Sequence, residues 1–586
     1  MSTQNAGYVA LSPSAEGTEN PGYPPSLESN HTPDGDEYHE RTLELQGGTF
    51  TVHSDGHSYS YAYGPKGLAG LRHNRYALLC AFFASIGGLE FGYDQGVIAN
   101  VLVMSDFMAR WPISPIQKGI MTAVLELGAL IGALAAGVYA DRYSRGQSIV
   151  AACVIFCIGS SFQCFAQQLS HIFIGRALGG VGVGLLSMLA PLYMAEISPP
   201  EVRGSLMALE QFSIVLGVVF GFWTGFMTRD LPGSASWRIP LGIQLFPGII
   251  LAAGCLFLPP SPRLLVLHGK YDEACASLAR LRTRTLEEAE GDLLLQLELL
   301  EMRVETTLIQ RVLERELGVP QTHGVAKPET GFVVEWRAWK RLFQERYRSR
   351  TWIGVLIMAF QQWSGINALL YYGPTLVHSI GLRGDTVTLL VSGGIGVVQL
   401  IAVLPAIAWI DKVGRRPLLR GGSTAMALSH LSIALLVIFF QNDWPAHRIA
   451  AWMAVGCIYT FTFAYGISFG PIGWVLPSEV FPLSMRSKGV ALSTASNWVN
   501  NFFIGLLTPV LVDLSPSATF IIFASACAAA FIWATRFVPE TANMALEEVD
   551  ALFQSNAGRE DRVLRGEIER ELGLRALVAE LMDICY

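Results

Sequence analysis

The apolar residues of this chain gather into stretches of membrane-spanning length, separated by short polar segments. A helix needs about 20 predominantly apolar residues to cross the hydrocarbon core of a bilayer. We place such stretches at residues 76–103, 119–139, 148–168, 171–195, 205–227, 239–258, 351–379, 386–410, 421–441, 449–476, 489–512 and 517–537. Six stretches, a long interruption and six more predict an all-α membrane protein. We expect twelve transmembrane helices in two pseudo-symmetric six-helix bundles, with cytosolic helices between the halves.

The polar segments divide the chain into five parts. Residues 1–73 are rich in Ser, Gly, Pro, Asp and Glu without an apolar run, which predicts a disordered cytosolic arm. The two bundles then occupy residues 74–258 and 351–537. Charged residues at helical spacing across 259–350 predict a cytosolic linker of amphipathic helices that lie against the cytosolic mouth. The tail, 538–586, is interpreted as a solvated charged helix.

Composition supports the membrane interpretation and excludes other classes. The chain is 51% hydrophobic and only 15% charged, with a mean hydropathy of +0.39, so most of its surface must face lipid. A net charge of -7 gives no sign of the basic surface that nucleic-acid binding requires. The nine cysteines lie mostly inside apolar stretches and suit neither a disulfide framework nor a metal site. Without a nucleotide loop or a nucleophile elbow, the sequence predicts neither an enzyme nor a cofactor.

The loops on one side of the predicted membrane collect Lys and Arg, including Arg145, Arg415, Arg416 and Lys488. Such positive loops stay in the cytosol, so both termini are expected there.

These loops also repeat one pattern in the two halves. The first copy consists of Glu196, Pro199 and Arg203. A second copy with the same internal spacing follows far downstream and consists of Glu479, Pro482 and Arg486. A second pair of motifs agrees, with Asp141 and Arg142 in the first half and Asp411 and Arg415 in the second. Parallel repeats of this kind are typical of transporters that rock two bundles about a central site.

Motifs spread over residues 76–550 resemble those of the sugar porter family of the major facilitator superfamily, with a fungal type of monosaccharide transporter as the nearest pattern. They lie at residues 91–97, 175–184, 191–196, 261–263, 361–367, 470–474 and 539–541. Pro260, the loop at 141–146 and the residues after Thr541 depart from the family pattern, and all three departures touch the predicted cytosolic gate. The resemblance implies the twelve-helix fold and transport of a sugar.

A monosaccharide presents hydroxyl groups that donate and accept hydrogen bonds, so its site needs neutral amides and an aromatic surface. Gln361, Gln362 and Asn367 supply amides that one straight helix would not place on a single face. A break at Ser364-Gly365 would bring them together, as the discontinuous helices of transporters do.

Further amides are expected around the same cavity. Asn497 and Asn501 lie four residues apart and so share one helix face. The resemblance implies that Gln211 and Trp474 complete the site, and Gln399 stands where the family commonly has Asn. The alternative is that these amides only hydrogen-bond neighbouring helices.

Asp94 is an ionisable residue inside a predicted span and is therefore a functional candidate. Burial disfavours a carboxylate and a nearby cation favours it, so Asp94 beside Arg176 would switch between a paired ion and a neutral acid. Relatives driven by protons carry Asp at this position, which implies proton symport. Glu90, four residues earlier, is expected to tune Asp94 or to bond a neighbouring helix. Glu126 and Glu210 are interpreted as buried, hydrogen-bonded helix contacts.

The charged loop residues are expected to form an ion-pair network between the bundles that closes the cytosolic side. This predicted gate comprises Asp141, Arg142, Glu196, Arg203, Arg263, Asp411, Arg415, Glu479, Arg486 and Glu540.

The sequence thus predicts a monomeric, alternating-access importer of a neutral hexose or pentose in a lipid bilayer, expected to be the plasma membrane. Proton coupling through Asp94 is the favoured mechanism. Two alternatives stay open: a passive sugar facilitator, and a sugar sensor on the same scaffold.

Overall fold

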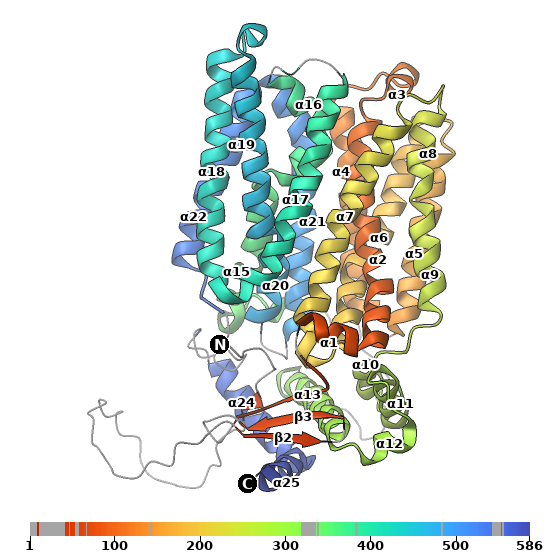
Figure 1. Ribbon diagram of the computed structural model, residues 1–586, viewed down its shortest axis with the longest axis vertical. Coiled ribbons are helices and arrows are strands. Elements are labelled where there is room, and N and C mark those ends of the chain that lie inside the picture. The colour runs from red at the N-terminus through yellow and green to blue at the C-terminus, as the bar shows by residue number, and fades with distance from the viewer. Residues whose placement is uncertain are drawn as a thin grey trace, which may run out of the picture.

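The computed structural model places two groups of long helices above a smaller extramembrane part (Figure 1). It describes residues 9–10, 41–45, 47–52, 58–65, 67–139, 143–317, 336, 339–380, 382, 385–481, 485–541, 553 and 556–585.

The first half is built from residues 75–255. Its helices are α2 (Arg75–Val101), the short α3 (Ser105–Arg110), α4 (Pro115–Tyr139), α5 (Arg145–Cys164), α6 (Leu169–Ile197), α7 (Arg203–Thr228), α8 (Ala235–Ile243) and α9 (Leu245–Cys255). Helices α8 and α9 follow one another as a single interrupted span.

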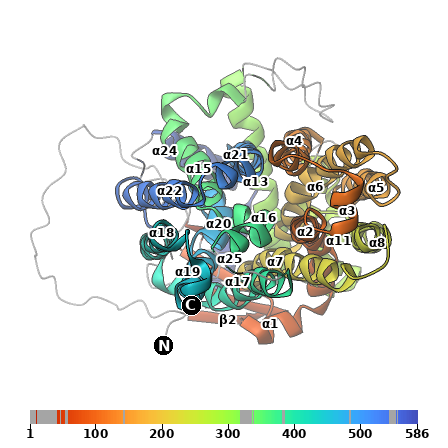
Figure 2. The same cartoon turned by 90° about the horizontal axis from the view of Figure 1, so that it is seen from above.

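The second half repeats this plan over residues 345–536. Its helices are α15 (Glu345–Trp363), α16 (Ile366–Ser379), α17 (Asp385–Val413), α18 (Arg415–Phe440), α19 (Arg448–Ile467), α20 (Phe469–Val480), α21 (Arg486–Leu514) and α22 (Pro516–Arg536). Two spans are broken, one between α15 and α16 and one between α19 and α20. Seen from above, α16, α17 and α21 face α2, α7 and α4 of the first half (Figure 2).

Eleven helical segments of the described chain are long and apolar enough to cross a membrane. The twelfth expected span, α21, has 29 residues but is not among them. Its amide side chains, which include Asn497, Asn500 and Asn501, lower its hydropathy. Because α21 packs along α4 and α15 inside the bundle, it completes the predicted six spans of the second half.

Glycine allows the close packing that makes the first half one unit. A Cβ added at Gly92 of α2 would lie 1.8 Å from the backbone oxygen of Ile214 in α7. At Gly184 of α6 it would lie 2.0 Å from the oxygen of Ala129 in α4. Small residues that let backbones approach drive helix association where lipid provides no hydrophobic force.

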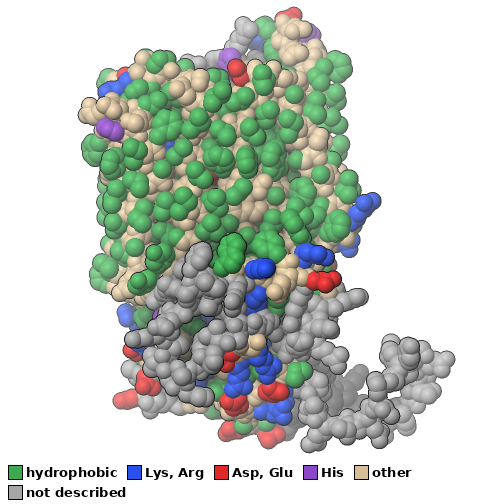
Figure 3. All heavy atoms as spheres, turned by 180° about the vertical axis from the view of Figure 1, so that it is seen from behind, with side chains coloured by type: hydrophobic (Ala, Val, Ile, Leu, Met, Phe, Trp, Pro, Cys, Tyr) green, Lys and Arg blue, Asp and Glu red, His purple; other side chains and the backbone are tan. Residues whose placement is uncertain are grey.

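The surface of the helical part is a broad apolar band, and charged side chains gather below it (Figure 3). Exposed residues such as Phe246, Ile249, Phe439 and Ile449 contribute to this band. An apolar surface of this extent is suited to lipid rather than to water.

Beneath the helices lies what we call the extramembrane module. It contains an antiparallel sheet in the order β1-β4-β3-β2, formed by Val9–Ala10, Ser58–Ala62, Gly48–Val52 and Arg41–Leu45. In the register of β3 and β4, Phe50 is opposite Tyr61. The sheet packs on α13 (Leu293–Leu317), α24 (Asn556–Glu571) and α25 (Leu574–Cys585) through a buried core that includes Phe50, Tyr59, Leu297 and Ile568.

Shorter helices connect the module to the bundle: α1 (Gly67–His73), α10 (Pro262–Leu267), α11 (Tyr271–Leu281) and α12 (Leu286–Gly291). The amphipathic linker helices predicted between the halves are therefore present. Helix α13 shares a core with the sheet, and α10, α11 and α12 form a second core with α13.

Two predictions about the polar ends are wrong for the residues that the structure describes there. The arm was predicted to be disordered, but residues 41–45, 48–52 and 58–62 form strands. The tail was predicted to be a solvated helix, but Leu564, Ile568 and Val578 are buried. The arm and the tail each have one apolar face, and these two faces pack into one core with α13.

Candidate functional site

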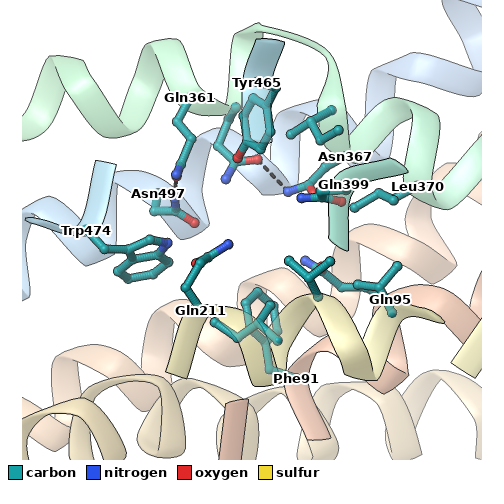
Figure 4. Close-up of a pocket in the computed structure, with 15 residues that line it drawn as sticks. Phe91, Gln95, Gln211, Gln361, Asn367, Leu370, Gln399, Tyr465, Trp474 and Asn497 are labelled. Atoms are coloured by element: carbon teal, nitrogen blue, oxygen red, sulfur yellow. Dashed lines mark hydrogen bonds between the residues drawn. The ribbon is translucent and has the colours of Figure 1, made fainter. Parts of the chain in front are cut away.

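A cavity lined by both halves lies between them (Figure 4). The first half lines it with Phe91, Gln95, Gln211, Ile214, Val215 and Val218. The second half lines it with Gln361, Gln362, Ile366, Asn367, Leu370, Gln399, Tyr465, Trp474 and Asn497.

The break between α15 and α16 shapes the cavity. Gly365, which directly precedes α16, has φ +96°, while α15 ends at Trp363. Glycine adopts this left-handed conformation without the steric cost that a side chain brings. The predicted break is therefore present, and it brings Asn367 next to Gln362, with Nδ2 donating to Oε1 at 2.6 Å.

The amide of Gln361 is held by protein groups. Its Nε2 donates to the carbonyl oxygens of Phe469 at 2.9 Å and Gly470 at 3.1 Å. These carbonyls belong to the first residues of α20, just after the break at Ser468. Its Oε1 accepts from Asn497 Nδ2 at 2.6 Å. Gln361 and Asn497 therefore fix each other's orientation at the cavity wall.

Two other amide side chains each have an acceptor oxygen without a hydrogen-bond partner in the part of the chain that the structure describes. The Oε1 atoms of Gln211 in α7 and Gln399 in α17 are buried and have no hydrogen-bond partner among the described residues. Buried polar atoms of folded proteins are nearly always paired, so such exceptions call for an explanation. The two oxygens come from opposite halves and both side chains line the cavity, so a ligand that donates hydrogen bonds would satisfy them.

Aromatic side chains supply the apolar surfaces of the cavity. Trp474 of α20 lies at one end in Figure 4, and Phe91 and Tyr465 lie on opposite walls. The ring of Phe91 also packs edge-on against Trp498, with centroids 5.1 Å apart.

The structure brings together all but one of the predicted ligand residues. Those that line the cavity are Gln211, Gln361, Gln362, Asn367, Gln399, Trp474 and Asn497. Asn501 instead lies behind the cavity wall, where its Oδ1 accepts from Asn367 Nδ2 at 2.9 Å.

Sequence reasoning missed Gln95, Tyr465 and Phe91 among the lining residues. Gln95 follows Asp94 directly and is an amide inside a span, so the sequence alone could have identified it as a lining residue. Tyr465 becomes recognisable only once α19 is placed beside α17.

Asp94 and Arg176 form the predicted pair. Arg176 Nη2 lies 3.4 Å from Asp94 Oδ2, and both side chains are buried. Arg176 Nε also donates to the backbone oxygen of Met121 at 2.7 Å, which ties α6 to α4. Because Asp94 neighbours Gln95 in α2, the pair lies directly beside the cavity.

Glu90 is fully buried, but it faces other helices. Its Oε1 and the Sγ of Cys157 lie 3.0 Å and 2.8 Å from the position that a Cβ on Gly248 of α9 would take. It is thus directed at α5 and α9, whereas Asp94 is directed at α6. The predicted common face of Glu90 and Asp94 does not bring their carboxylates to the same neighbours.

Two ion pairs repeat one geometry in the two halves. Arg145 Nη2 lies 2.8 Å from Glu196 Oε1, and Arg415 Nη2 lies 2.6 Å from Glu479 Oε1. In each case the first residue of one span meets a residue near the end of the next span along the half, which in the second half is made of α19 and α20. Glu540 adds to the second copy by accepting from the backbone amides of Arg415 and Arg416 at 2.8 and 3.0 Å.

The gate was expected to join the bundles, and this stays a prediction. Of the gate residues that the structure describes, Glu196, Arg415 and Glu479 pair within their own half. Arg263 pairs with Glu305 of α13 at 2.8 Å, and Arg486 begins α21. Asp141 and Arg142 lie outside the described residues, as do the side chains of Arg203 and Asp411.

Comparison with known proteins agrees with this geometry. A family model described as "Sugar (and other) transporter" matches residues 80–553. The chain is 32% identical over 527 residues to "Probable polyol transporter 3" of Arabidopsis thaliana. This match covers 87% of this chain and 97% of the relative. The chain is also 30% identical over 559 residues to "High glucose sensor RGT2" of Saccharomyces cerevisiae. This match covers 90% of this chain and 69% of the relative.

A solved structure has the same fold. The proton:xylose symporter XylE, bound to 6-bromo-6-deoxy-D-glucose, superposes with a TM-score of 0.64 at 26% identity. The match covers 82% of this chain and 99% of the symporter.

Proposed function

Because the chain belongs to the sugar porter family of the major facilitator superfamily, we propose that it imports a neutral monosaccharide, a hexose or a pentose, together with protons. Import occurs by alternating access, with a proton bound at Asp94. The proposal places the protein in the plasma membrane as a monomer, with both termini and the extramembrane module in the cytosol.

The two unpaired amide oxygens carry the proposal. Gln211 Oε1 and Gln399 Oε1 belong to different halves and line one cavity. A sugar ring offers several hydroxyl donors at once, so one molecule satisfies both oxygens and bridges the halves. Trp474 offers the flat apolar surface on which a sugar ring rests.

The charge of the cavity supports a neutral substrate. None of the described residues that line it is charged. A sugar acid would leave its carboxylate without a cation in a largely buried site, which is costly.

The position of Asp94 supports proton coupling. Its pair with Arg176 is buried, so protonation of Asp94 would change the charge balance next to the cavity without solvent to compensate. The relative whose fold superposes is named as a proton symporter.

A sensor is the second candidate, and one feature favours it. The extramembrane module unites the arm, the linker and the tail in one core, so a change between the halves would reach all three segments. The resemblance to a protein named as a glucose sensor fits the same view. A passive facilitator would use the same cavity, with Asp94 in a structural role.

Uptake of radiolabelled glucose, xylose and sorbitol in cells that lack sugar transporters tests the proposal. The unmodified chain should concentrate glucose or xylose, and a protonophore should abolish this accumulation. Asp94→Asn should reduce uptake to downhill flux. Sorbitol tests whether a polyol is taken instead.

Downhill uptake that ignores the protonophore would establish the facilitator. Absence of uptake at normal membrane levels would favour the sensor. Gln441→Ala, which changes an exposed amide at the end of α18, serves as the control variant and should behave as the unmodified chain does.

A further inference from the structure

A carboxylate from the first half is bonded to two helices of the second half, beside the cavity. Glu126 of α4 is fully buried. Its Oε1 accepts from the hydroxyl of Tyr371 in α16 at 2.7 Å, and its Oε2 accepts from Asn501 Nδ2 in α21 at 2.8 Å. We call these three residues the Glu126 junction.

The position of every hydrogen in the junction follows from the donors that surround it. The hydroxyl oxygen of Tyr371 accepts from Gln95 Nε2 at 3.1 Å and from Asn501 Nδ2 at 2.9 Å. A hydroxyl has two acceptor lone pairs and one hydrogen, so this hydrogen goes to Glu126. The two hydrogens of Asn501 Nδ2 go to Tyr371 and Glu126. Both oxygens of Glu126 therefore accept hydrogen bonds, which is the bonding pattern of an ionised carboxylate.

The junction is continuous with the cavity. Asn501 Oδ1 accepts from Asn367 Nδ2 at 2.9 Å, and the second hydrogen of that amide goes to Gln362 Oε1 at 2.6 Å. Gln95 bonds Tyr371 from the other side. Gln95, Gln362 and Asn367 all line the cavity, so a bound ligand and the carboxylate are joined by hydrogen bonds alone.

We propose that Glu126 is a second proton-binding residue, separate from Asp94, and that its ionised form locks the two halves together on the side of the cavity away from the extramembrane module. A protonated Glu126 must donate from one oxygen. Tyr371 has no lone pair left and Asn501 Nδ2 cannot accept, so the added hydrogen finds no acceptor in either residue and weakens the bond between the halves at that oxygen. Proton binding thereby releases the lock.

The location of the junction determines which side it closes. Helix α16 runs from the break beside the cavity to the end of the bundle opposite the module (Figure 1). Tyr371 lies on this segment, and its neighbour Tyr372 also bonds α21, donating to the backbone oxygen of Gly505 at 2.6 Å. In the proposed orientation this is the outer side, so external protons open the cavity to the substrate.

Other titratable and charged groups surround Glu126. They are Asp94 from α2, Arg176 from α6 and the phenols of Tyr371 and Tyr372 from α16, while α21 contributes the amide of Asn501. The inference rests on the proposed function in one respect, because it takes the two halves to be moving parts.

Distance measurement by electron paramagnetic resonance tests the lock without sugar. Spin labels are attached through a ketone-bearing amino acid at exposed Gln117 and His378, at the outer ends of α4 and α16. In the unmodified chain the distance should lengthen as the pH is lowered. Glu126→Gln, in which the amide cannot accept from both donors, should show the longer, low-pH distance at every pH.

Two further variants make the result decisive. Glu210→Gln removes another buried carboxylate of the first half and should keep the pH-dependent shift. Tyr371→Phe removes the three hydrogen bonds of this hydroxyl, two of them between the halves, and leaves Glu126 able to titrate, so its distance at high pH should exceed that of the unmodified chain. A shift of unmodified size in Glu126→Gln, or a distance independent of pH in the unmodified chain, would overturn the proposal. Because no sugar is present, failure of uptake would count against the proposed function alone.

Discussion

Arg282 and Glu298 form a two-point ion pair inside the extramembrane module. Arg282 Nη2 lies 2.6 Å from Glu298 Oε1, and Nε lies 3.1 Å from Oε2. Both side chains are almost inaccessible to solvent. Arg282 also donates to the backbone oxygen of Ile197 at 3.1 Å and lies 5.0 Å from the ring centre of Tyr63. One guanidinium thus joins the arm, the linker and the end of α6.

Replacing Arg282 with Met should destabilise the protein strongly. The carboxylate of Glu298 would be left buried and unpaired, which typically costs about 3–5 kcal/mol. Thermal unfolding in detergent, followed by intrinsic fluorescence, measures the change. Lys270→Met breaks the exposed pair with Glu273 and should cost about 0–1 kcal/mol. Equal effects of the two substitutions would contradict the structural role given to Arg282.

The module should lose stability as the pH rises. Burial raises the pKa of Glu301 above its ordinary value of 4.5, against the opposing effect of the hydroxyls of Tyr61 and Tyr59, each of which donates at 2.8 Å. A raised pKa in the folded state means that the neutral acid is favoured there. This stabilisation is complete below pH 4.5 and is lost as the pH rises through the raised pKa.

Melting temperatures of the unmodified chain and of Glu301→Gln, compared from pH 4.5 to pH 8, test this prediction. The amide cannot ionise, so the difference between the two should move in favour of the variant with rising pH. A difference that is constant across the range, or that moves the other way, would show that ionisation of Glu301 does not weaken the module.

Truncating either unpaired amide should weaken sugar binding. Gln211→Leu or Gln399→Leu leaves a sugar hydroxyl buried without an acceptor, at a cost of about 1–3 kcal/mol. Affinity should therefore fall about 5- to 150-fold, with the fold and the membrane level unchanged. Binding of the sugar identified by uptake, followed by tryptophan fluorescence, provides the measurement. Unchanged affinity in both variants would remove these residues from the site.

Gly365→Ala should distort the cavity. The residue has φ +96°, and an added Cβ would lie 2.9 Å from the ring of Phe523. A non-glycine residue in this conformation costs about 1–2 kcal/mol before the contact is counted. Melting temperature and sugar affinity should both fall. Gly456→Ala in α19 is the matched control, because nothing lies within 4 Å of its Cβ position, and it should be neutral or slightly stabilising.

The helical part of the fold could be predicted because lipid imposes strict rules on it. Backbone groups must be satisfied within each span, so length and hydropathy reveal the spans. Of the spans that the structure describes, only α21 does not meet the hydropathy criterion, because its amide side chains lower its hydropathy. These side chains face protein groups. The break at Ser364-Gly365 was also predictable, because three amides at non-helical spacing needed one cavity.

The extramembrane module was missed for a different reason. Composition made residues 1–73 look disordered, but Phe50 and Val52, and then Tyr59, Tyr61 and Tyr63, follow the two-residue period of a strand. Attention to this alternation would have predicted strands. What they pack against could not be predicted, since their partners on α13 and α24 lie more than 200 residues away along the chain.

The candidate site shows the same limit. The chemistry of Gln211, Gln361, Asn367 and Gln399 could be predicted from what a sugar requires. The bonds of Glu126 to Tyr371 and Asn501 could not, because they depend on which helices of opposite halves become neighbours. The residue was expected to be a hydrogen-bonded helix contact, and it is one, but its partners lie across the interface.

The order of synthesis gives the extramembrane module a further consequence. Residues 41–62 leave the ribosome before any span does, and residues 556–585 leave it after all of them. The apolar face of the sheet, with Phe50 and Tyr59, is therefore covered only in part, by α13, until Ile568 and Leu574 are synthesised. Quality-control factors that bind exposed apolar segments would have access to this face throughout translation. A chain that stopped before α24 would keep part of this face exposed.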